Sequence, residues 1–211
     1  MTKWQCLNLT KWQIFEEQCI QMSRKKMDKI DLKIVRSLRE DARRSITDLA
    51  SDVGISRPTV MKRLKKMLEK ETIHIDTGIN LKELGLRIGC VGLEVKGAES
   101  RSKVRKILQN CPRVLMILCP FEKTTFSVYV FGEDRETLRS TIYSFATFPD
   151  TSIAHISYSD PPLYPKTFPI RIGSKKSTVA PCSIKCSDCF SYNEGACVGC
   201  PAVVEYKGSL G

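Results

Sequence analysis

Three short amphipathic segments follow one another between residues 27 and 71, and this run constrains the fold more than any other feature of the chain. In MDKIDLKIVRSLRE, apolar residues recur with a helical period and aspartates occupy the first turn, where the helix dipole favours them. In SITDLASDV, Ser45 and the aspartate three residues later have capping-box spacing, and Gly54 then terminates the helix. SRPTVMKRLKKMLEKE opens with Ser56 as its predicted N-cap and Pro58 in its first turn. The sequence therefore predicts a helix-turn-helix.

The third of these helices carries much of the basic charge. Residues 56–71 contain six Lys or Arg and two Glu, in a chain of 211 residues with a formal net charge of +11. A basic balance alone also fits a solvated helix of an ordinary bundle, but a capped helix and a glycine turn before it favour DNA binding. The predicted outer face of this recognition helix consists of Arg57, Thr59, Lys62, Arg63, Lys65 and Lys66.

A second domain is predicted after the helices. TIHIDTGIN, residues 72–80, has the pattern of a short β-hairpin, which would be the wing of a winged helix. Residues 87–160 then alternate strand and helix patterns in the order βαββαβ, which is typical of a ferredoxin-like sandwich. The predicted fold class is α+β: an N-terminal winged helix-turn-helix, a βαββαβ dimerisation domain and a short Cys-rich tail.

Residues 27 to about 160 resemble the Lrp/AsnC family, the leucine-responsive or feast-or-famine transcription regulators. The resemblance rests on ITDLASDVGIS, the recognition-helix pattern Ser-x-x-Thr-Val-x-x-Arg, LKELGL and the βαββαβ order. It implies a sequence-specific regulator, not an enzyme, that binds double-stranded DNA as a homodimer formed through the βαββαβ domain. Such dimers often assemble into tetramers or octamers. Carried over position by position, the recognition-helix face comprises Ser56, Arg57, Pro58, Thr59, Lys62 and Arg63.

Arg57, Lys62 and Arg63 are the residues expected to reach base edges and phosphates, since arginine pairs well with guanine. Lys65 and Lys66 are expected to meet phosphates, or only water. The family pattern also includes Thr-Gly followed by Tyr-Asp near an amino-acid site. The corresponding CPFEKTTFSVYV lacks that Gly and Asp, so the resemblance does not support a bound amino-acid effector.

Five cysteines lie within nineteen residues near the C-terminus, in CSIKCSDCFSYNEGACVGC. Two Cys-x2-Cys pairs joined by a short loop suit a tetrahedral metal ion, which would supply the folding energy that so short a segment lacks. The predicted metal ligands are Cys186, Cys189, Cys197 and Cys200, with Cys182 as a fifth thiol. The predicted boundaries are an N-terminal extension over 1–26, a DNA-binding domain over 27–80, a dimerisation domain over 81–160, a Pro-rich linker over 161–181 and a metal-binding module over 182–206.

Zinc is the favoured metal, but the spacing leaves alternatives open. Cys182-x3-Cys186-x2-Cys189 could hold three corners of an iron–sulfur cluster, and Cys200 precedes a proline as the last ligand of some ferredoxin runs does. Thiol–disulfide or metal sensing is a third reading, and structural disulfides come last. Of the other cysteines, Cys90 and Cys119 are predicted to be small buried hydrophobes.

No apolar run approaches the roughly 20 residues of a membrane helix, and the N-terminus lacks the apolar core of a signal peptide. A reducing, cytoplasmic location is therefore expected. The rival functions are an iron–sulfur or thiol redox protein and a non-specific architectural DNA-binding protein. An enzyme is disfavoured, because the sequence contains no phosphate loop or paired acid–base constellation, and its two histidines lie far apart.

Overall fold

The computed structural model describes residues 27–120, 125–172 and 177–210. The predicted N-terminal extension over 1–26 lies outside the described residues, as does part of the CPFEKTTFSVYV stretch. The chain divides into two compact units, Met1–Ile75 and Asp76–Gly211. The C-terminal cysteines thus belong to the same unit as the βαββαβ domain.

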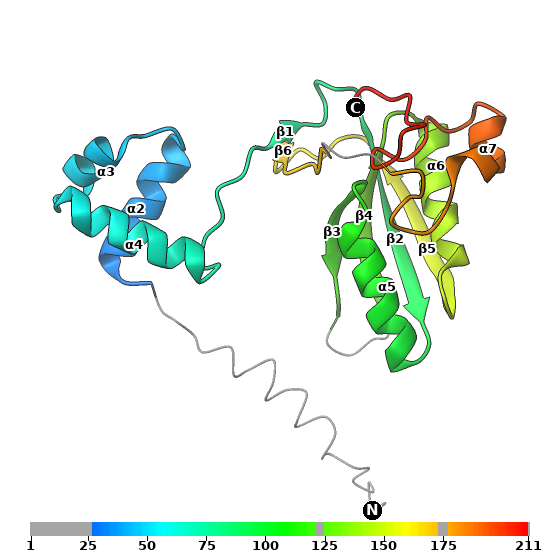
Figure 1. The fold of residues 1–211 in the computed structure, drawn as a ribbon, viewed down its shortest axis with the longest axis horizontal. Helices are drawn as coiled ribbons and strands as arrows, with labels where there is room; N and C mark the ends of the chain where they lie inside the picture. The colour runs from blue at the N-terminus through cyan, green and yellow to red at the C-terminus, as the bar shows by residue number, and fades with distance from the viewer. Residues whose placement is uncertain (1–26, 121–124, 173–176, 211) are drawn as a thin grey trace, which may run out of the picture. The chain divides into compact units, whose positions relative to one another are not determined.

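Three helices form the described part of the first unit: α2 (Lys29–Glu40), α3 (Ile46–Val53) and α4 (Arg57–Glu69) (Figure 1). Capping boxes begin both α2 and α3, as the aspartates in their first turns allow. Gly54 ends α3 with φ of 75°, a left-handed conformation in which a side chain would be strained. The predicted helix-turn-helix is confirmed.

The core of the first unit is one apolar cluster to which all three helices contribute. Its buried members are Ile34, Leu49, Ala50, Val53, Val60 and Met67, and their helical spacing directs each toward the centre of the bundle. Leu68 of α4 is apolar but exposed. It lies one residue beyond Met67, and this position on the helix turns it away from the cluster.

The predicted wing is not formed. Residues 73–78 contain no strand, and β1 (Ile79–Asn80) pairs antiparallel with β6 (Thr167–Phe168) rather than within a hairpin. The alternating apolar residues of TIHIDTGIN therefore predicted the wrong partner, because they indicated a hairpin between neighbouring strands. The extended residues 79–80 hydrogen bond to a segment far along the chain, in the second unit.

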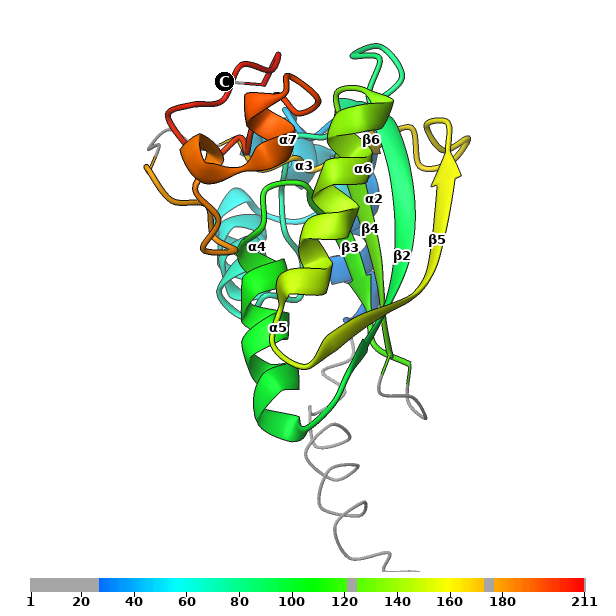
Figure 2. The same ribbon diagram turned by 90° about the vertical axis from the view of Figure 1, so that its right-hand side faces the viewer.

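The second unit contains a four-stranded antiparallel sheet of strand order β3-β4-β2-β5. Helices α5 and α6 both lie on one face of this sheet, as Figure 2 shows. The predicted βαββαβ order is confirmed by β2 (Arg87–Val95), α5 (Ala98–Asn110), β3 (Val114–Leu118), β4 (Thr125–Gly132), α6 (Arg135–Ser144) and β5 (Thr151–Ser159).

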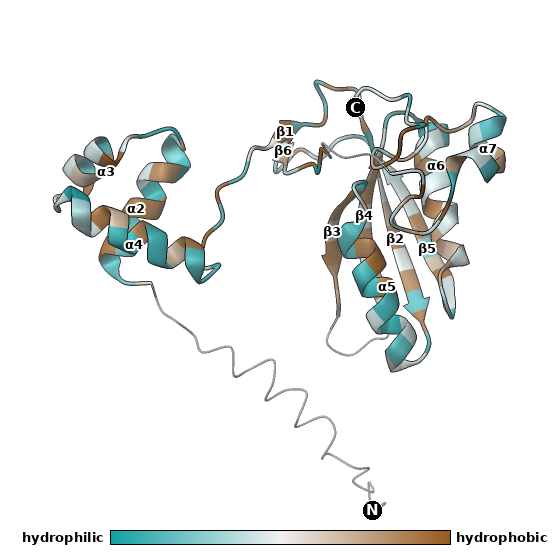
Figure 3. Cartoon of the chain, viewed as in Figure 1, coloured by the Kyte–Doolittle hydropathy of each residue, from teal (hydrophilic) through white to brown (hydrophobic). Residues whose placement is uncertain are grey.

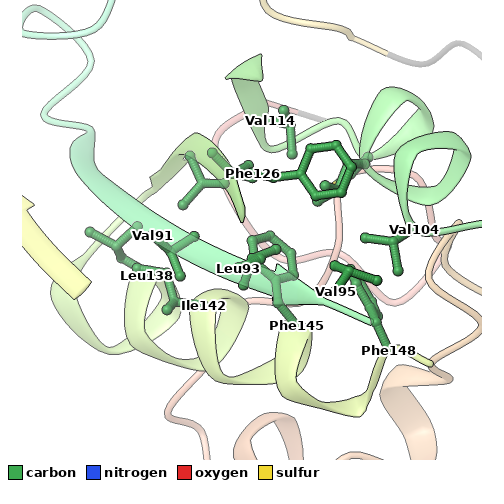
Figure 4. Packing of buried hydrophobic residues seen from close by; sticks show 14 residues of the cluster. Val91, Leu93, Val95, Val104, Val114, Phe126, Leu138, Ile142, Phe145 and Phe148 are labelled. Carbon is green, nitrogen blue, oxygen red and sulfur yellow. The ribbon is translucent and has the colours of Figure 1, made fainter. Parts of the chain in front are cut away.

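The main core lies between the sheet and its two helices. Side chains of β2 and α6 interdigitate there, and Leu93, Leu138 and Ile142 are fully buried (Figure 4). Colouring by hydropathy gives the strands apolar stretches and the helices a hydrophilic outer side (Figure 3). Gly132 ends β4 where the α6 backbone approaches closely, since a Cβ there would lie 2.7 Å from the amide nitrogen of Leu138.

The C-terminal segment, residues 177–210, packs onto this domain with little regular structure. It contains a 3-10 turn over Cys186–Asp188 and the single-turn helix α7 (Phe190–Asn193), which lies beside α6 in Figures 1 and 2. Tyr206 and Leu210 are buried in one cluster with Phe131 of β4. No helix in the described ranges has the length and apolarity needed to cross a membrane.

Candidate nucleic-acid interface and thiol pocket

The exposed face of α4 presents unpaired cations. Arg57, Lys62 and Lys66 are all exposed, and none has an acidic partner in the part of the chain that the structure describes. Lys65 is exposed too, but its ammonium group lies 3.7 Å from the Glu69 carboxylate one turn on. Three cations are thus available for phosphate or base contacts without first breaking an ion pair.

Arg63 has a different environment from its neighbours on α4. Its Nη1 donates to Asp28 Oδ2 at 2.6 Å and to Asp31 Oδ1 at 2.7 Å. The backbone N–H of Asp31 and then the guanidinium lower the Asp28 pKa, and the two carboxylates raise the Arg63 pKa. Its side chain is 28% exposed. Arg63 therefore holds α4 against the start of α2, and contact with DNA would compete with this role.

The first turn of α4 departs from the predicted cap. Ser56 occupies the N-cap position, but its side chain accepts no hydrogen bond from the amides of the first turn. Its hydroxyl instead lies 2.8 Å from Thr59 Oγ1, and both residues are exposed, as is Pro58. Thr59 and Pro58 line a groove of about 780 Å³ together with Lys62, Lys66 and Asp28.

The second candidate site is a small pocket of about 70 Å³ lined by six cysteines. Five come from the C-terminal segment and the sixth, Cys111, follows the end of α5. Within the described ranges, no group of three or more His, Cys, Asp or Glu side chains has the arrangement needed to hold a metal ion. The pocket is lined by Cys111, Cys182, Cys186, Cys189, Cys197 and Cys200.

Buried polar contacts fix the turn between Cys197 and Cys200 on the βαββαβ domain. Arg113, only 3% exposed, donates to the Gly199 carbonyl and to the Glu133 carboxylate. The backbone N–H of Val198 donates to Thr137 Oγ1 at 3.3 Å. Tyr206 extends the network, because its hydroxyl donates to the same Glu133 carboxylate.

A backbone amide of the segment donates to one of its thiols: the N–H of Gly199 donates to Cys197 Sγ at 3.4 Å. Nearby backbone groups also act to lower the pKa values of Cys186 and Cys200. Such bonds stabilise negative charge on sulfur. Burial opposes them: it raises the pKa of Cys186, that of Cys111 to about 11 and that of Cys200 to about 12. Burial therefore favours the protonated thiol at all three positions.

Comparison with known proteins identifies the type of domain in the first unit. Residues 27–68 match the AsnC-type helix-turn-helix domain. The regulator LrpC of Bacillus subtilis is 24% identical over 141 residues, which is 64% of this chain and 94% of LrpC. Its solved structure superposes with a TM-score of 0.52 at 23% identity, over 65% of this chain and 99% of LrpC, so the fold is shared. Residues 27–68 are therefore similar to the AsnC-type helix-turn-helix domain, and the chain as a whole shares the fold of LrpC.

Two further proteins are similar to this chain. The transcriptional regulator Ptr1 of Methanocaldococcus jannaschii is 36% identical over 83 residues, 38% of this chain, and the match spans only 56% of Ptr1. The structure of Escherichia coli AsnC superposes with a TM-score of 0.53 at 22% identity, over 66% of this chain and 95% of AsnC. Each superposition leaves about a third of the present chain unmatched.

The sequence pattern does not identify Cys111, which lies outside the predicted C-terminal group. It is nevertheless only 9% exposed and shares a pocket with the C-terminal thiols. Conversely, Cys119, predicted to be buried, is exposed, and Cys90 is only partly buried. No local pattern marks Cys111, because the proximity to the other thiols arises from a segment some seventy residues later in the chain.

Proposed function

We propose that the chain is a sequence-specific DNA-binding transcription regulator of the Lrp/AsnC type, acting as a homodimer on double-stranded DNA. The observation that supports this most strongly is the exposed cationic face of α4, with Arg57, Lys62 and Lys66 unpaired among the described residues of an AsnC-type domain. The relatives named above are regulators, which argues against an enzyme. Two recognition helices of a dimer would meet half-sites about one helical turn apart, or a multiple of it.

A fluorescence-anisotropy titration with duplex DNA at several salt concentrations tests this proposal. The double variant Arg57→Ala/Lys62→Ala is expected to weaken binding and to reduce the slope of log K against log salt by about 2, one for each lost phosphate contact. The matched control is Arg105→Ala/Lys106→Ala, which removes two exposed cations from α5. Equal loss in the control, or none in the α4 variant, would contradict the assignment.

Sequence specificity separates a regulator from an architectural DNA-binding protein. Competition between random DNA and fragments from upstream of genes, at fixed salt, measures the ratio of the two affinities. A regulator is expected to prefer its site by at least about 1,000-fold. A ratio near one would replace the regulator with a non-specific DNA-coating protein. Sedimentation of the free protein measures whether the dimer, or a tetramer or octamer of it, is the form that binds.

We further propose that the C-terminal thiols bind a metal ion, zinc in the first instance, which modulates or stabilises the regulator. Support comes from the convergence of five cysteines of this segment on one pocket and from the hydrogen bond between the Gly199 amide and the Cys197 sulfur. The candidate ligands are Cys186, Cys189, Cys197 and Cys200, with Cys182 alongside. Thiolates are preferred ligands of Zn²⁺, and their closure round the ion would require a rearrangement of the segment.

Metal content and absorbance of protein purified without oxygen test this second part. About one zinc per chain in a colourless protein, lost when all four ligands are changed to Ser, is the expected result. Iron with sulfide in a brown protein would favour the alternative of an iron–sulfur redox sensor. Absence of any metal, with reversible loss of free thiols on oxidation, would favour thiol–disulfide sensing. Operator affinity measured with and without the metal then tells a sensor from a structural site.

A further inference from the structure

Both the βαββαβ domain and the C-terminal segment contribute cysteines to the thiol pocket. This affects what a bound metal ion would do. Cys111 is the residue that caps the C-terminal end of α5, where its backbone N–H bonds the Leu108 carbonyl. Its own carbonyl accepts from the N–H of Val114 at the start of β3. This thiol therefore belongs to a rigid corner of the βαββαβ domain, whereas the other five belong to the C-terminal segment.

Cys182 is the C-terminal thiol that most directly joins the two sides. It packs against the main core cluster, of which Cys111 is a buried member. It also packs against the small C-terminal cluster around Ala180 and Val203, together with Cys200. Cys111, Cys182 and Cys200 thus line the part of the pocket at which the domain and the segment meet.

The same corner of the domain holds the second Cys-x2-Cys pair in place. Arg113, two residues after Cys111, binds the carbonyl of Gly199, which lies between Cys197 and Cys200. Thr137 binds the neighbouring Val198 amide. Because these contacts position the pair relative to α5 and α6, the thiol of Cys111 and that of Cys200 approach the pocket from fixed backbones.

We propose that Cys111 is a ligand of the thiol site, together with Cys182 and Cys200, so that a bound thiophilic metal ion links the C-terminal segment to the α5–β3 corner. The inference rests on the metal binding proposed above, and it adds a ligand from the βαββαβ domain. A soft, closed-shell ion such as Zn²⁺ or Cd²⁺ suits this apolar, sulfur-lined pocket. Metal occupancy would then be felt by the domain that forms the dimer, and not only by the tail.

Cd²⁺ is the probe for this site, since the intensity of its charge-transfer absorbance scales with the number of bound thiolates. Full-length, reduced, metal-free protein is titrated without oxygen, as wild type, Cys111→Ala and the matched control Cys119→Ala, whose thiol is exposed and outside the pocket. Cys111→Ala is expected to lower the affinity at least about tenfold and to reduce the absorbance per bound ion. Cys119→Ala is expected to leave both unchanged.

A second readout covers the case in which Cys111→Ala disturbs folding. The rise in melting temperature on adding Cd²⁺ is compared for wild type, Cys111→Ala and Cys111→Ser, each relative to its own metal-free form. Both variants are expected to lose most of this rise. Wild-type affinity and absorbance in a folded Cys111→Ala protein would overturn the inference while leaving metal binding intact. Absence of Cd²⁺ binding in wild type would overturn both proposals.

Discussion

The helix-turn-helix and the C-terminal cysteine segment are held together by opposite means. In the first unit, each helix is specified within a few residues by its own cap, its apolar stripe and the left-handed Gly54. The segment over 177–210 has one single-turn helix and a 3-10 turn, and it depends on contacts with distant residues such as Arg113. Structure that comes from local signals withstands the loss of one distant partner, whereas structure that depends on such a partner does not.

The largest effect is expected from Arg113→Met. This change leaves the Glu133 carboxylate, which is 11% exposed, without its cation, and it frees the Gly199 carbonyl. Breaking a buried pair by removing one partner costs about 3–5 kcal/mol. Hydrogen exchange followed by mass spectrometry should show faster exchange in peptides from residues 177–210 and unchanged exchange in α2–α4.

The double variant Arg113→Met/Glu133→Gln sharpens this test. Gln removes the orphaned charge while it can still accept from the Tyr206 hydroxyl. We therefore expect it to recover part of the lost free energy of unfolding, as a double-mutant cycle would report. Wild-type exchange in Arg113→Met would show that the segment does not depend on this anchor, and the contrast between the two regions would fail.

Leu49→Ala is expected to have the next largest effect, now confined to the first unit. Leu49 is 1% exposed at the centre of the three-helix core, and truncation of such a leucine costs about 2–5 kcal/mol. Exchange should accelerate across α2, α3 and α4 while the C-terminal peptides stay protected. The control is Leu32→Ala, because Leu32 is half exposed. Faster exchange throughout the whole chain would show that the two units unfold together.

Thr137→Val tests the smaller anchor of the cysteine segment. It removes the acceptor of the Val198 amide with little change in volume, and an unsatisfied, partly buried donor costs about 1–2 kcal/mol. Exchange at the Cys197–Cys200 turn should rise more than exchange elsewhere. Thr147→Val, on an exposed residue whose hydroxyl donates only to the Ser144 carbonyl, serves as control. An equal response in both variants would remove Thr137 from the set of anchors.

The smallest expected effect is a change in pH dependence in the first unit. The pKa of Asp28 lies below its ordinary value of 3.8, so its ionised form stabilises the folded state above that pH and this stabilisation is lost as pH falls. Asp28→Asn keeps an N-cap acceptor but removes the charge facing Arg63. Urea midpoints should therefore differ between variant and wild type at pH 6 and converge near pH 3, unlike those of the exposed control Glu83→Gln.

The elements with local causes could be predicted from the sequence. Capping residues and hydrophobic period placed the three helices, and the alternation of patterns placed the βαββαβ order. The wing could not be predicted, because Ile79 and Asn80 take their partners from residues 167–168. Nor could the restraint of Arg63 by Asp28 and Asp31, since nothing in the recognition-helix sequence indicates carboxylates at the start of another helix.

The same distinction between local and distant causes applies to the candidate thiol site. The spacing of the C-terminal cysteines identified them as a group, because all five lie within one short stretch. Cys111 was missed because its neighbours in space come from the far end of the chain. Residues 182–206, predicted as a metal-binding module, lie in the unit Asp76–Gly211, and no local pattern predicts the contacts that they make there.

The Arg113–Gly199 contact joins residues that lie far apart in the sequence. This has a consequence for how the chain folds during its synthesis. The core of the helix-turn-helix is built entirely from residues 27–73, so it can fold on the ribosome as soon as these residues have left the exit tunnel. The sulfur-lined pocket cannot close until residues 182–200 have also been translated and released. During that interval the nascent chain carries a folded helix-turn-helix and a Cys111 thiol that the C-terminal segment does not yet cover. Oxidants or free metal ions in the cell would therefore meet Cys111 first on unfinished chains.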